Sequence, residues 1–413
     1  MKTFIGFILI LFATISCQPT EELIENENLP ANNNNPIVLP DVQTLRINTV
    51  NGRNITSRDN YIDGQIEELD INGNIVSTRT IEIRGRGNSS WQFPKKSYQI
   101  KFDNKRSLLG MAKDERWLLI ANYSDKSMMR NEIGYELSRM SNLEFTTDSR
   151  YVDLVLNNQL VGTYLLTQKI EVTNNRLPLS EDGYILEIDQ LSRLNVDDVY
   201  FNSGNYLYNI KFPEVVQNDN RYNYIQNYMN NFEAALNSAN FTDPNLGYRR
   251  YLDVDSMVDW YIIKEISKTN DAAFWTSVYL NLEPEEKLKM GPVWDFDISF
   301  GNINYRNNET TDGFYLKNRG WFNRLFQDPY FVDKVQQRFS FYYNNMDLIY
   351  DYIDAHRINL DASQTANFQV WPILGSYVWP NYVWFNTYDE EVDYLEQWIR
   401  LRMDWLNAEI PNL

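Results

Sequence analysis

Apolar and polar residues alternate through most of the chain between residues 43 and 190, in short runs separated by turn-forming residues. A period of two is typical of β-strands that bury one face, and Asn-Gly pairs between such runs are typical of hairpin turns. The alternation predicts strands and hairpins at residues 44–52, 67–93, 95–102, 116–123, 151–170 and 182–189.

A helical period of 3.6 residues dominates the chain beyond about residue 220. One earlier helix is expected at residues 125–141, with Asp125 or Ser127 as its N-cap. The later helices are expected at residues 221–239, 253–269, 330–357 and 390–410. A β-rich first half followed by a helical second half predicts an α+β chain of two lobes, at about residues 43–195 and 196–410.

A short strand pair, predicted at residues 276–297 with its turn at Glu283–Glu286, interrupts these helices. Its second strand leads into the sequence GPVWDFDISFGN, which places Asp295 and Asp297 among apolar residues. An unpaired carboxylate in a buried strand is costly, so this pair needs a cation, a hydrogen-bond donor or a reaction. The period of two points both aspartates to the same side, where both could reach one cation.

The aspartate pair is compatible with several kinds of site. A calcium loop of the EF-hand type needs Gly at its sixth position and Glu at its twelfth, but Phe300 and Arg306 stand there, which excludes it. A nucleotide-sugar transferase also binds its metal with an Asp-x-Asp pair, and the residues alone do not exclude it. A purely structural pair, bonded to Arg or Lys, is a further alternative.

Asp271 is the third acidic residue of interest, because it follows the predicted helix 253–269 in a polar loop. Only 24 residues separate it from Asp295, and one hairpin can fold that length back so that both carboxylates meet at one edge. A few carboxylates together with phosphate oxygens are the ligands that Mg²⁺ prefers, and Mn²⁺ suits a similar set. The spacing therefore predicts a metal site for a polyphosphate.

Basic residues are concentrated around a Gly-containing turn, RGRGNSSW. Between Arg79 and Arg106 there are eight basic residues and two acidic ones, although the whole chain carries a formal charge of −18. Backbone amides of such a turn, together with Lys and Arg on the next strand, can hold phosphate oxygens. An edge strand protected by lysines is the alternative interpretation.

Composition limits the remaining possibilities. With 43% hydrophobic residues and many aromatic ones, the 413-residue chain is expected to fold. Its charge of −18 argues against binding to nucleic acid or to an anionic membrane surface. Its single histidine, His356, makes a multi-histidine zinc site or a Ser-His-Asp triad improbable, and it is expected to be a surface or packing residue.

The first 17 residues have the form of a secretory signal: a lysine, an apolar run, then small or polar residues that end at Cys17. A cysteine in this position resembles the lipidation site of a bacterial lipoprotein, with a plain signal peptide or a short anchor as the alternatives. The run is short for a membrane span. Residues 18–42 are acidic, rich in Asn and bounded by Pro, which predicts a flexible tether.

Several long motifs occur in an order that resembles the spore-coat protein H (CotH) kinase family. They are IRGRGNSSWQFPKKSYQIKF, WLLIANYSDKSMMRNEIGYELS, VGTYLLTQKI, GYILEID, GPVWDFDISFGN, GWFNRLFQDPYF and LEQWIRLRMDWL. The resemblance covers about residues 43–410 and implies a divergent, two-lobed protein-kinase fold. It also implies that the domain binds ATP with a divalent metal and phosphorylates Ser or Thr on proteins.

The resemblance assigns roles to individual residues. Asp271 matches the catalytic-loop aspartate, Asp295 the metal-binding aspartate, and Asp297 a second metal or water ligand. The phosphate-binding candidates are Lys96, Lys101, Arg84 and Arg130, and Asn131 and Glu132 begin the helix expected to face the lysine. The chain departs from the expected pattern at Gln168, where the family usually has Glu, and at Thr276, where kinases have Asn.

The function expected from these features is that of an exported, lipid-anchored protein kinase that uses ATP with Mg²⁺ or Mn²⁺. Its protein substrate would be basic or rich in Ser, because the chain itself is strongly acidic. A surface module that binds protein or glycan on the same fold is the alternative from another class. The aromatic stretch VWPILGSYVWPNYVWFN would suit such a module.

Overall fold

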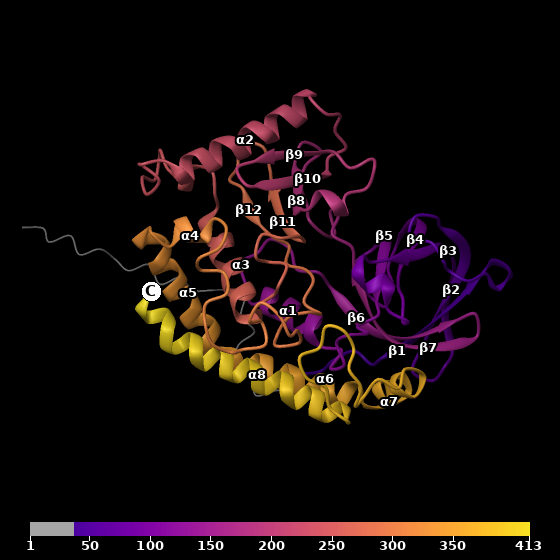
Figure 1. The fold of residues 1–413 in the computed structure, drawn as a ribbon. Helices are drawn as coiled ribbons and strands as arrows, with labels where there is room; N and C mark the ends of the chain where they lie inside the picture. The colour runs from indigo at the N-terminus through magenta and orange to yellow at the C-terminus, as the bar shows by residue number, and fades with distance from the viewer. Residues whose placement is uncertain (1–36) are drawn as a thin grey trace, which may run out of the picture. The chain divides into compact units, whose positions relative to one another are not determined.

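Seven strands close into a barrel in the first part of the structure, a computed structural model that describes residues 37–413 (Figure 1). The strand order is β1-β2-β3-β4-β5-β7-β6, and β1 pairs with β6 in parallel to close the barrel. Inward-facing residues such as Ile47, Ile83, Ile100 and Trp117 fill it. The strands are β1 Gln43–Thr49, β2 Ile62–Leu69, β3 Ile75–Arg86, β4 Ser97–Arg106, β5 Asp114–Ile120, β6 Ser149–Leu156 and β7 Gln159–Gln168.

A second sheet follows, with the order β12-β11-β8-β10-β9. Its strands are β8 Tyr184–Asp189, β9 Tyr200–Ser203, β10 Tyr206–Phe212, β11 Val278–Leu282 and β12 Lys289–Met290. All of its pairs are antiparallel. β8 therefore joins strands from later in the chain rather than the barrel that precedes it. The β9–β10 hairpin was missing from the sequence prediction, although VYFNSGNYLYNIKF alternates in the expected way.

Residues 37–413 also contain eight α-helices, seven of which follow residue 219. The predicted helix 330–357 is two helices, which meet at Asn345. The helix predicted at 125–141 begins only at Arg130, because Asp125 accepts a hydrogen bond from the Arg130 backbone N–H (2.9 Å) and holds the preceding residues as a loop. The helices are α1 Arg130–Arg139, α2 Asn220–Asn237, α3 Val254–Ser267, α4 Phe322–Leu325, α5 Pro329–Asn344, α6 Met346–Asn359, α7 Asp361–Val370 and α8 Tyr388–Glu409.

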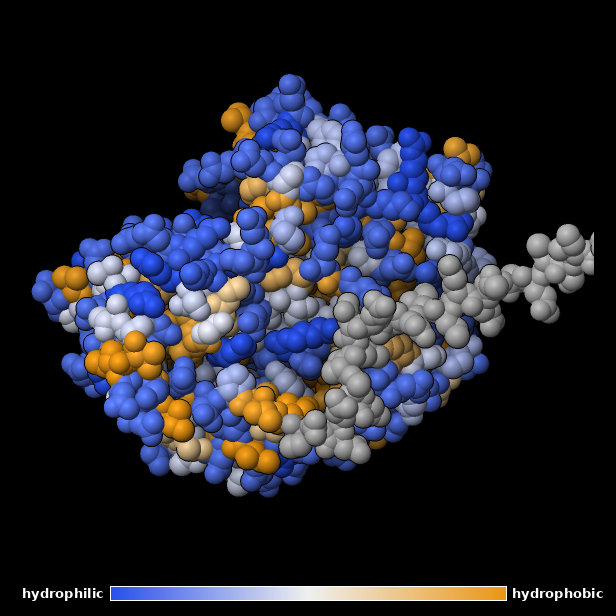
Figure 2. Space-filling model, turned by 180° about the vertical axis from the view of Figure 1, so that it is seen from behind, coloured by the Kyte–Doolittle hydropathy of each residue, from blue (hydrophilic) through white to orange (hydrophobic). Residues whose placement is uncertain are grey.

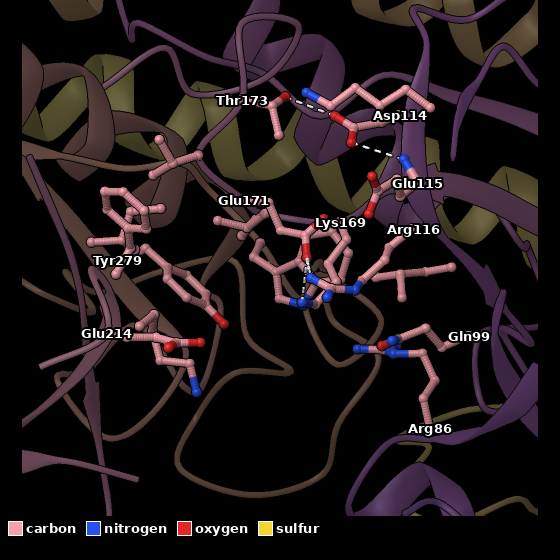
Figure 3. A pocket seen from close by; sticks show the side chains of 18 residues that line it. Arg86, Gln99, Asp114, Glu115, Arg116, Lys169, Glu171, Thr173, Glu214 and Tyr279 are labelled. Atoms are coloured by element: carbon pink, nitrogen blue, oxygen red, sulfur yellow. Dashed lines mark hydrogen bonds and ion pairs between the residues drawn. The ribbon is translucent and has the colours of Figure 1, made fainter. Parts of the chain in front are cut away.

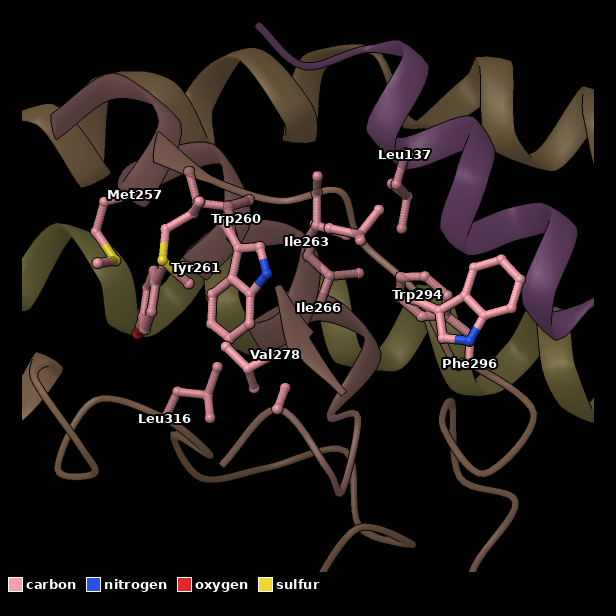
Figure 4. Packing of buried hydrophobic residues seen from close by; sticks show 14 of the residues in the cluster. Leu137, Met257, Trp260, Tyr261, Ile263, Ile266, Val278, Trp294, Phe296 and Leu316 are labelled. Carbon is pink, nitrogen blue, oxygen red and sulfur yellow. The ribbon is translucent and has the colours of Figure 1, made fainter. Parts of the chain in front are cut away.

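Helix α3 lies at the centre of the larger core and buries 12 of its 14 residues. It packs against α1, α5 and α8, and Figure 4 shows its Trp260 and Ile263 among the side chains of that core. A helix with apolar residues on every side is stable only when it is enclosed in this way. The end of α3 is therefore a rigid support for the loop that carries Asp271.

A buried ion pair fixes that end of α3. Arg402 of α8 is fully buried and donates to Oε1 of Glu265 (2.7 Å) and to the carbonyl oxygens of Thr311 and Gly313 (2.9 Å each). The Glu265 carboxylate also accepts the backbone N–H groups of Tyr315 and Leu316. A buried charge pair is tolerated only when its remaining hydrogen-bonding capacity is used, and here it is.

The expected α+β class is confirmed, with a β-rich first part and a helical second part. One local prediction is wrong: the strand expected to run to Asp297 ends at Met290, and residues 291–297 have no regular secondary structure. The strand cannot continue as predicted because Gly291, the residue after Met290, has a φ of 106°, and Asp295 takes a left-handed conformation as well, with φ of 67°.

The surface seen from behind in Figure 2 is mostly hydrophilic, with hydrophobic residues in small separate groups. Within residues 37–413, no helix is both long enough and apolar enough to cross a bilayer. The predicted signal peptide at 1–17, the lipidation site Cys17 and most of the predicted tether at 18–42 lie outside the described residues.

Candidate functional site

Asp271 stands in the loop that follows α3. Lys268 ends the helix in a left-handed conformation (φ 46°) and turns the chain, and its ammonium group donates to the carbonyl oxygens of Asn307 (3.1 Å) and Thr310 (2.9 Å). The side-chain amide of Asn270 donates to Oδ1 of Asp271 (2.8 Å). Asp271 has no other side-chain hydrogen bond within residues 37–413, which leaves its second oxygen available.

Two buried aromatic side chains hold the segment that carries the other aspartates. Trp294 and Phe296 are 7% and 0% exposed and lie in the core beside α1 and α3 (Figure 4). The Lys264 ammonium group donates to the Trp294 carbonyl oxygen (2.6 Å) and lies 3.7 Å from the centre of the Phe296 ring. Gly134 lets α1 approach that ring, because a Cβ there would meet it at 2.3 Å.

Asp295 and Asp297 alternate with these buried rings and are themselves only partly buried. The Phe296 backbone N–H donates to Oδ1 of Asn131 on α1 (2.8 Å), and the Ser277 hydroxyl donates to Oδ2 of Asp295 (3.3 Å). The two carboxylates therefore share one side of the segment, as predicted. The cause is the burial of their aromatic neighbours in a loop, not the period of a strand.

Three adjoining cavities surround these residues, and Arg86 and Trp294 line all three. The aspartate cavity, of about 390 Å³, is lined by Asp271, Asp295 and Asp297. A small cavity of about 30 Å³ is lined by Asp295, Asp297, Asn131 and Lys95. The large cavity, of about 670 Å³, opens between the barrel and the second sheet. The predicted catalytic and metal-binding aspartates are thus brought together.

The large cavity combines apolar walls with a network of charges. Leu118, Ile170 and Ile185 supply the apolar surface. Glu171 accepts from Arg116 (2.6 Å) and Lys169 (2.8 Å), and Figure 3 shows this group facing Tyr279 and Glu214 across the cavity. Residues 169–173 leave the barrel after β7, so the chain that joins the barrel to the second sheet forms one wall.

The three aspartates repel one another, and burial strengthens the effect. Burial, followed by the charges of Asp295, Asp125 and Asp271, raises the pKa of Asp297 to about 8. Burial and the charge of Asp295 raise the pKa of Asp271 to about 6. Burial lowers the pKa of Lys264 to about 7, although Asp295 and Asp271 oppose the shift. The cavity therefore has an excess of negative charge that a bound cation would relieve.

This donor set is compatible with a hard divalent cation. Asp295 and Asp297 offer carboxylate oxygens at the same cavity, and Mg²⁺ commonly binds to one or two carboxylates, with water and phosphate oxygens completing its shell. Residues 37–413 contain no group of three or more Asp, Glu, His or Cys side chains in metal-binding geometry. A self-sufficient protein cage is therefore absent from the described residues, and phosphate oxygens would have to complete the set.

The four basic residues predicted to bind phosphate line none of these three cavities. Lys96 donates to the Trp91 carbonyl oxygen (2.6 Å). Lys101 pairs with Glu82 (2.7 Å), and Arg84 donates to the Arg58 carbonyl oxygen (2.7 Å). Arg130 is buried in an ion pair with Asp125 (2.6 Å) and also donates to the carbonyl oxygen of Ser299 (3.1 Å).

Arg86 and Lys95 instead line the small cavity together with Asp295 and Asp297, and sequence reasoning did not single them out. Arg86 ends β3 and has no ion pair within residues 37–413. Lys95 is buried, which lowers its pKa to about 7, and it donates to the Thr163 carbonyl oxygen and to Oδ1 of Asn367 (2.8 Å). Both belong to the basic cluster found in the sequence, but Arg84 and Arg86 share one strand face, so periodicity could not separate them.

The departures from the kinase pattern have clear places in the structure. Gln168 is buried at the end of β7, where its Oε1 accepts the Asp148 backbone N–H (3.0 Å), and it lines none of the three cavities. The Thr276 hydroxyl donates to Asp189 (2.6 Å). Ser277, the next residue, is the one that contacts Asp295.

A protein-family model matches most of the chain. The family model described as CotH kinase protein matches residues 83–406, which include the turn after β3, Asp271 and the segment of Asp295 and Asp297. No curated protein matches the chain. Because the family model spans well over half of the sequence, the chain belongs to the CotH kinase family.

Proposed function

We propose that the protein is an atypical kinase that transfers the γ-phosphate of ATP to a Ser or Thr hydroxyl of a protein substrate. Membership of the CotH kinase family implies kinase activity and, with it, the use of ATP. The observation that carries the proposal is the meeting of Asp271, Asp295 and Asp297 at one cavity, which adjoins a cavity of about 670 Å³. We also propose that residues 43–410 form one two-lobed, protein-kinase-like domain.

The nucleotide would lie along the three cavities. The adenine ring would occupy the large cavity between Leu118, Ile170 and Ile185, since an aromatic base needs apolar walls. Its phosphates would then point toward Arg86, which lines all three of these cavities and has no ion pair within residues 37–413. Lys95, whose pKa burial lowers to about 7, would add positive charge at the small cavity when it is protonated.

Asp271 would act as the base. The substrate hydroxyl oxygen forms a bond to the γ-phosphorus, the bond from that phosphorus to the bridging oxygen breaks, and ADP leaves with the bonding electrons. Asp271 accepts the hydroxyl proton. A pKa near 6 leaves most of this carboxylate ionised at neutral pH while making it more basic than an ordinary aspartate. The amide of Asn270 orients it.

Asp295 and Asp297 would hold Mg²⁺ or Mn²⁺. When bound, the ion neutralises charge on the phosphate oxygens. The chain keeps both carboxylates at the cavity by burying Trp294 and Phe296, and Ser277 orients Asp295 through its hydrogen bond.

Replacing Asp271 by Asn should lower kcat by roughly 100-fold or more, because the base is lost. The fold should persist, since an amide of similar size replaces a carboxylate with one hydrogen bond. Transfer from labelled ATP with Mn²⁺ to a Ser-rich basic protein, or to the chain itself, measures the effect. Asp103→Asn, on the exposed part of β4, is the control and should keep full activity. Undiminished transfer by Asp271→Asn would refute the assigned role.

Arg86→Met should weaken the use of ATP by roughly 10- to 100-fold in kcat/KM, because a charge-assisted contact to phosphate contributes about 1.5–3 kcal/mol. Arg84→Met is the matched control, two residues earlier on β3 and bonded to the Arg58 carbonyl oxygen, so it should change kcat/KM by about twofold or less. If Arg84→Met had the larger effect, Arg86 would not be the residue that binds the phosphates, and the proposed placement would be refuted.

Binding of Mn²⁺ should tighten as the pH rises from 6 to 8. A pKa of about 8 means that Asp297 is mostly protonated below that pH and must lose its proton to bind the ion. Calorimetry at pH 7 in two buffers of different ionisation heat should therefore detect proton release. In Asp297→Asn the release should disappear. Equal proton release by both proteins would exclude Asp297 as a ligand.

A binding module without turnover is the second candidate, and the exposed aromatic side chains favour it. Trp275 and Trp379 are 49% and 52% exposed at the aspartate cavity, and Tyr382 and Trp384 are exposed nearby in the chain.

The effect of ATP on the melting temperature distinguishes a kinase from a binding module. A kinase should show a higher melting temperature with ATP and Mn²⁺, whereas glycan retention without any nucleotide effect would favour the module.

We further propose that the protein is exported and anchored by a lipid at Cys17, from the signal-like pattern of residues 1–17 and not from any described residue. Cys17→Ser should move the protein from the membrane fraction to the soluble fraction, and unchanged fractionation would contradict the lipid anchor.

The protein substrate would be basic or rich in Ser. A basic substrate is expected because a chain of charge −18 attracts positive partners.

A further inference from the structure

Trp275 exposes a large aromatic side chain beside the proposed catalytic base. The residue is 49% exposed and lines the aspartate cavity together with Asp271. Its backbone N–H donates to the Asp271 carbonyl oxygen (3.1 Å), so a single tight turn separates the two residues. The proposed mechanism gives Trp275 no part, because it lines neither the large cavity assigned to adenine nor the small cavity.

The loop that carries Trp275 is anchored on both sides. Phe274, the residue before it, is buried against Trp321, with the ring centroids 5.0 Å apart. Phe274 takes a left-handed conformation (φ 59°), which is rare for a bulky residue and persists only where the surrounding packing enforces it. On the other side, the Ser277 hydroxyl donates to Asp295 (3.3 Å). Because both ends of the loop are held, Trp275 is kept at the cavity.

Arg306 holds the indole of Trp275 in place. Its guanidinium carbon lies 4.6 Å from the centre of the Trp275 ring, a distance typical of a cation–π contact. Arg306 also donates to Oδ1 of Asn270 (3.4 Å), the residue whose amide orients Asp271. An aromatic surface that is already fixed loses little conformational entropy when a ligand binds to it. Trp275 is therefore a preorganised surface, and about half of it is open to a ligand.

Other apolar and aromatic residues line the aspartate cavity and are absent from the large one. They are Ile298, Tyr305, Trp379 and Pro380. The nucleotide is assigned to the large cavity and to Arg86, which leaves this surface to the second reactant. A protein that brings its Ser or Thr hydroxyl to Asp271 also brings the neighbouring residues close to Trp275, because residues of an extended chain are only about 3.3 Å apart.

We propose that Trp275 determines substrate specificity by binding an apolar side chain that stands within two residues of the phosphoacceptor Ser or Thr. This inference rests on the proposed kinase function and adds a substrate class to it, namely acceptor sites flanked by an aromatic or aliphatic residue. Contact between that side chain and the indole removes apolar surface of both from water, which stabilises the complex. Basic residues farther along the substrate would still be attracted by the negative charge of the chain.

The test compares peptides that contain one Ser and differ only in whether Phe or Ala occupies one of the two positions on either side of it. Transfer from ATP with Mn²⁺ by the full chain should show a kcat/KM roughly tenfold higher for the best Phe peptide than for its Ala partner, because burial of a Phe side chain contributes at least that much. In Trp275→Ala the ratio should fall to about twofold or less, while the KM for ATP stays unchanged. Trp275→Phe, which keeps an aromatic ring, should retain most of the preference.

Tyr330→Ala is the matched control. Tyr330 is also an exposed aromatic residue in contact with an arginine, since the guanidinium carbon of Arg249 lies 4.5 Å from its ring centre. It belongs to α5 and lines none of the three cavities, so its loss should leave the preference for Phe unchanged. Binding of the same peptides, measured by fluorescence anisotropy without nucleotide, should follow the same order.

Transfer and binding together separate this proposal from the kinase function on which it rests. Equal kcat/KM for Phe and Ala peptides, or a preference that persists in Trp275→Ala, would overturn the role of Trp275 and leave the kinase intact. Peptide binding that depends on Trp275 without any transfer would refute the kinase but support the contact with an apolar side chain. The absence of both transfer and binding would overturn both. Glycan retention that Trp275→Ala removes, with no peptide bound, would assign this surface to the binding module instead.

Discussion

The burial of Trp294 and Phe296 is the constraint on which the candidate site depends. These two rings occupy the core between α1 and α3, and Lys264 fixes the backbone between them by donating to the Trp294 carbonyl oxygen (2.6 Å). The residues between and after the rings must then face the cavity, and both are aspartates. The hydrophobic effect thereby supplies the free energy that holds two mutually repelling carboxylates at one place.

The same arrangement links the site to the rest of the molecule. Asn131 connects α1 to the Phe296 backbone, and α3 carries both Lys264 and the loop of Asp271. The buried pair of Arg402 and Glu265 then joins the end of α3 to α8. A site built from loops is therefore supported by helices whose positions are determined by core packing, which limits how far its carboxylates can separate.

Much of this could be predicted from the sequence, though some of it for the wrong reason. Alternating residues located most barrel strands, and the spacing of Asp271 and Asp295 correctly indicated that they meet. The shared side of Asp295 and Asp297 was inferred from a strand that ends before them, at Met290. The sequence located the basic cluster but not the members of it that lie beside the aspartates. Lys96 and Arg84 were among the predicted phosphate ligands, whereas Lys95 and Arg86 line the small cavity.

The sequence by itself determined the fold class, most of the elements in their order, the family and the types of residue available for chemistry. These follow from local periodicity and from motifs that are contiguous in the chain. Only the tertiary structure decided which basic residues line a cavity with the aspartates and that His356 lies buried, with both ring nitrogens unpaired within residues 37–413. Such outcomes depend on contacts between residues far apart in sequence, as between Lys95 and Asn367, and no local pattern encodes those contacts.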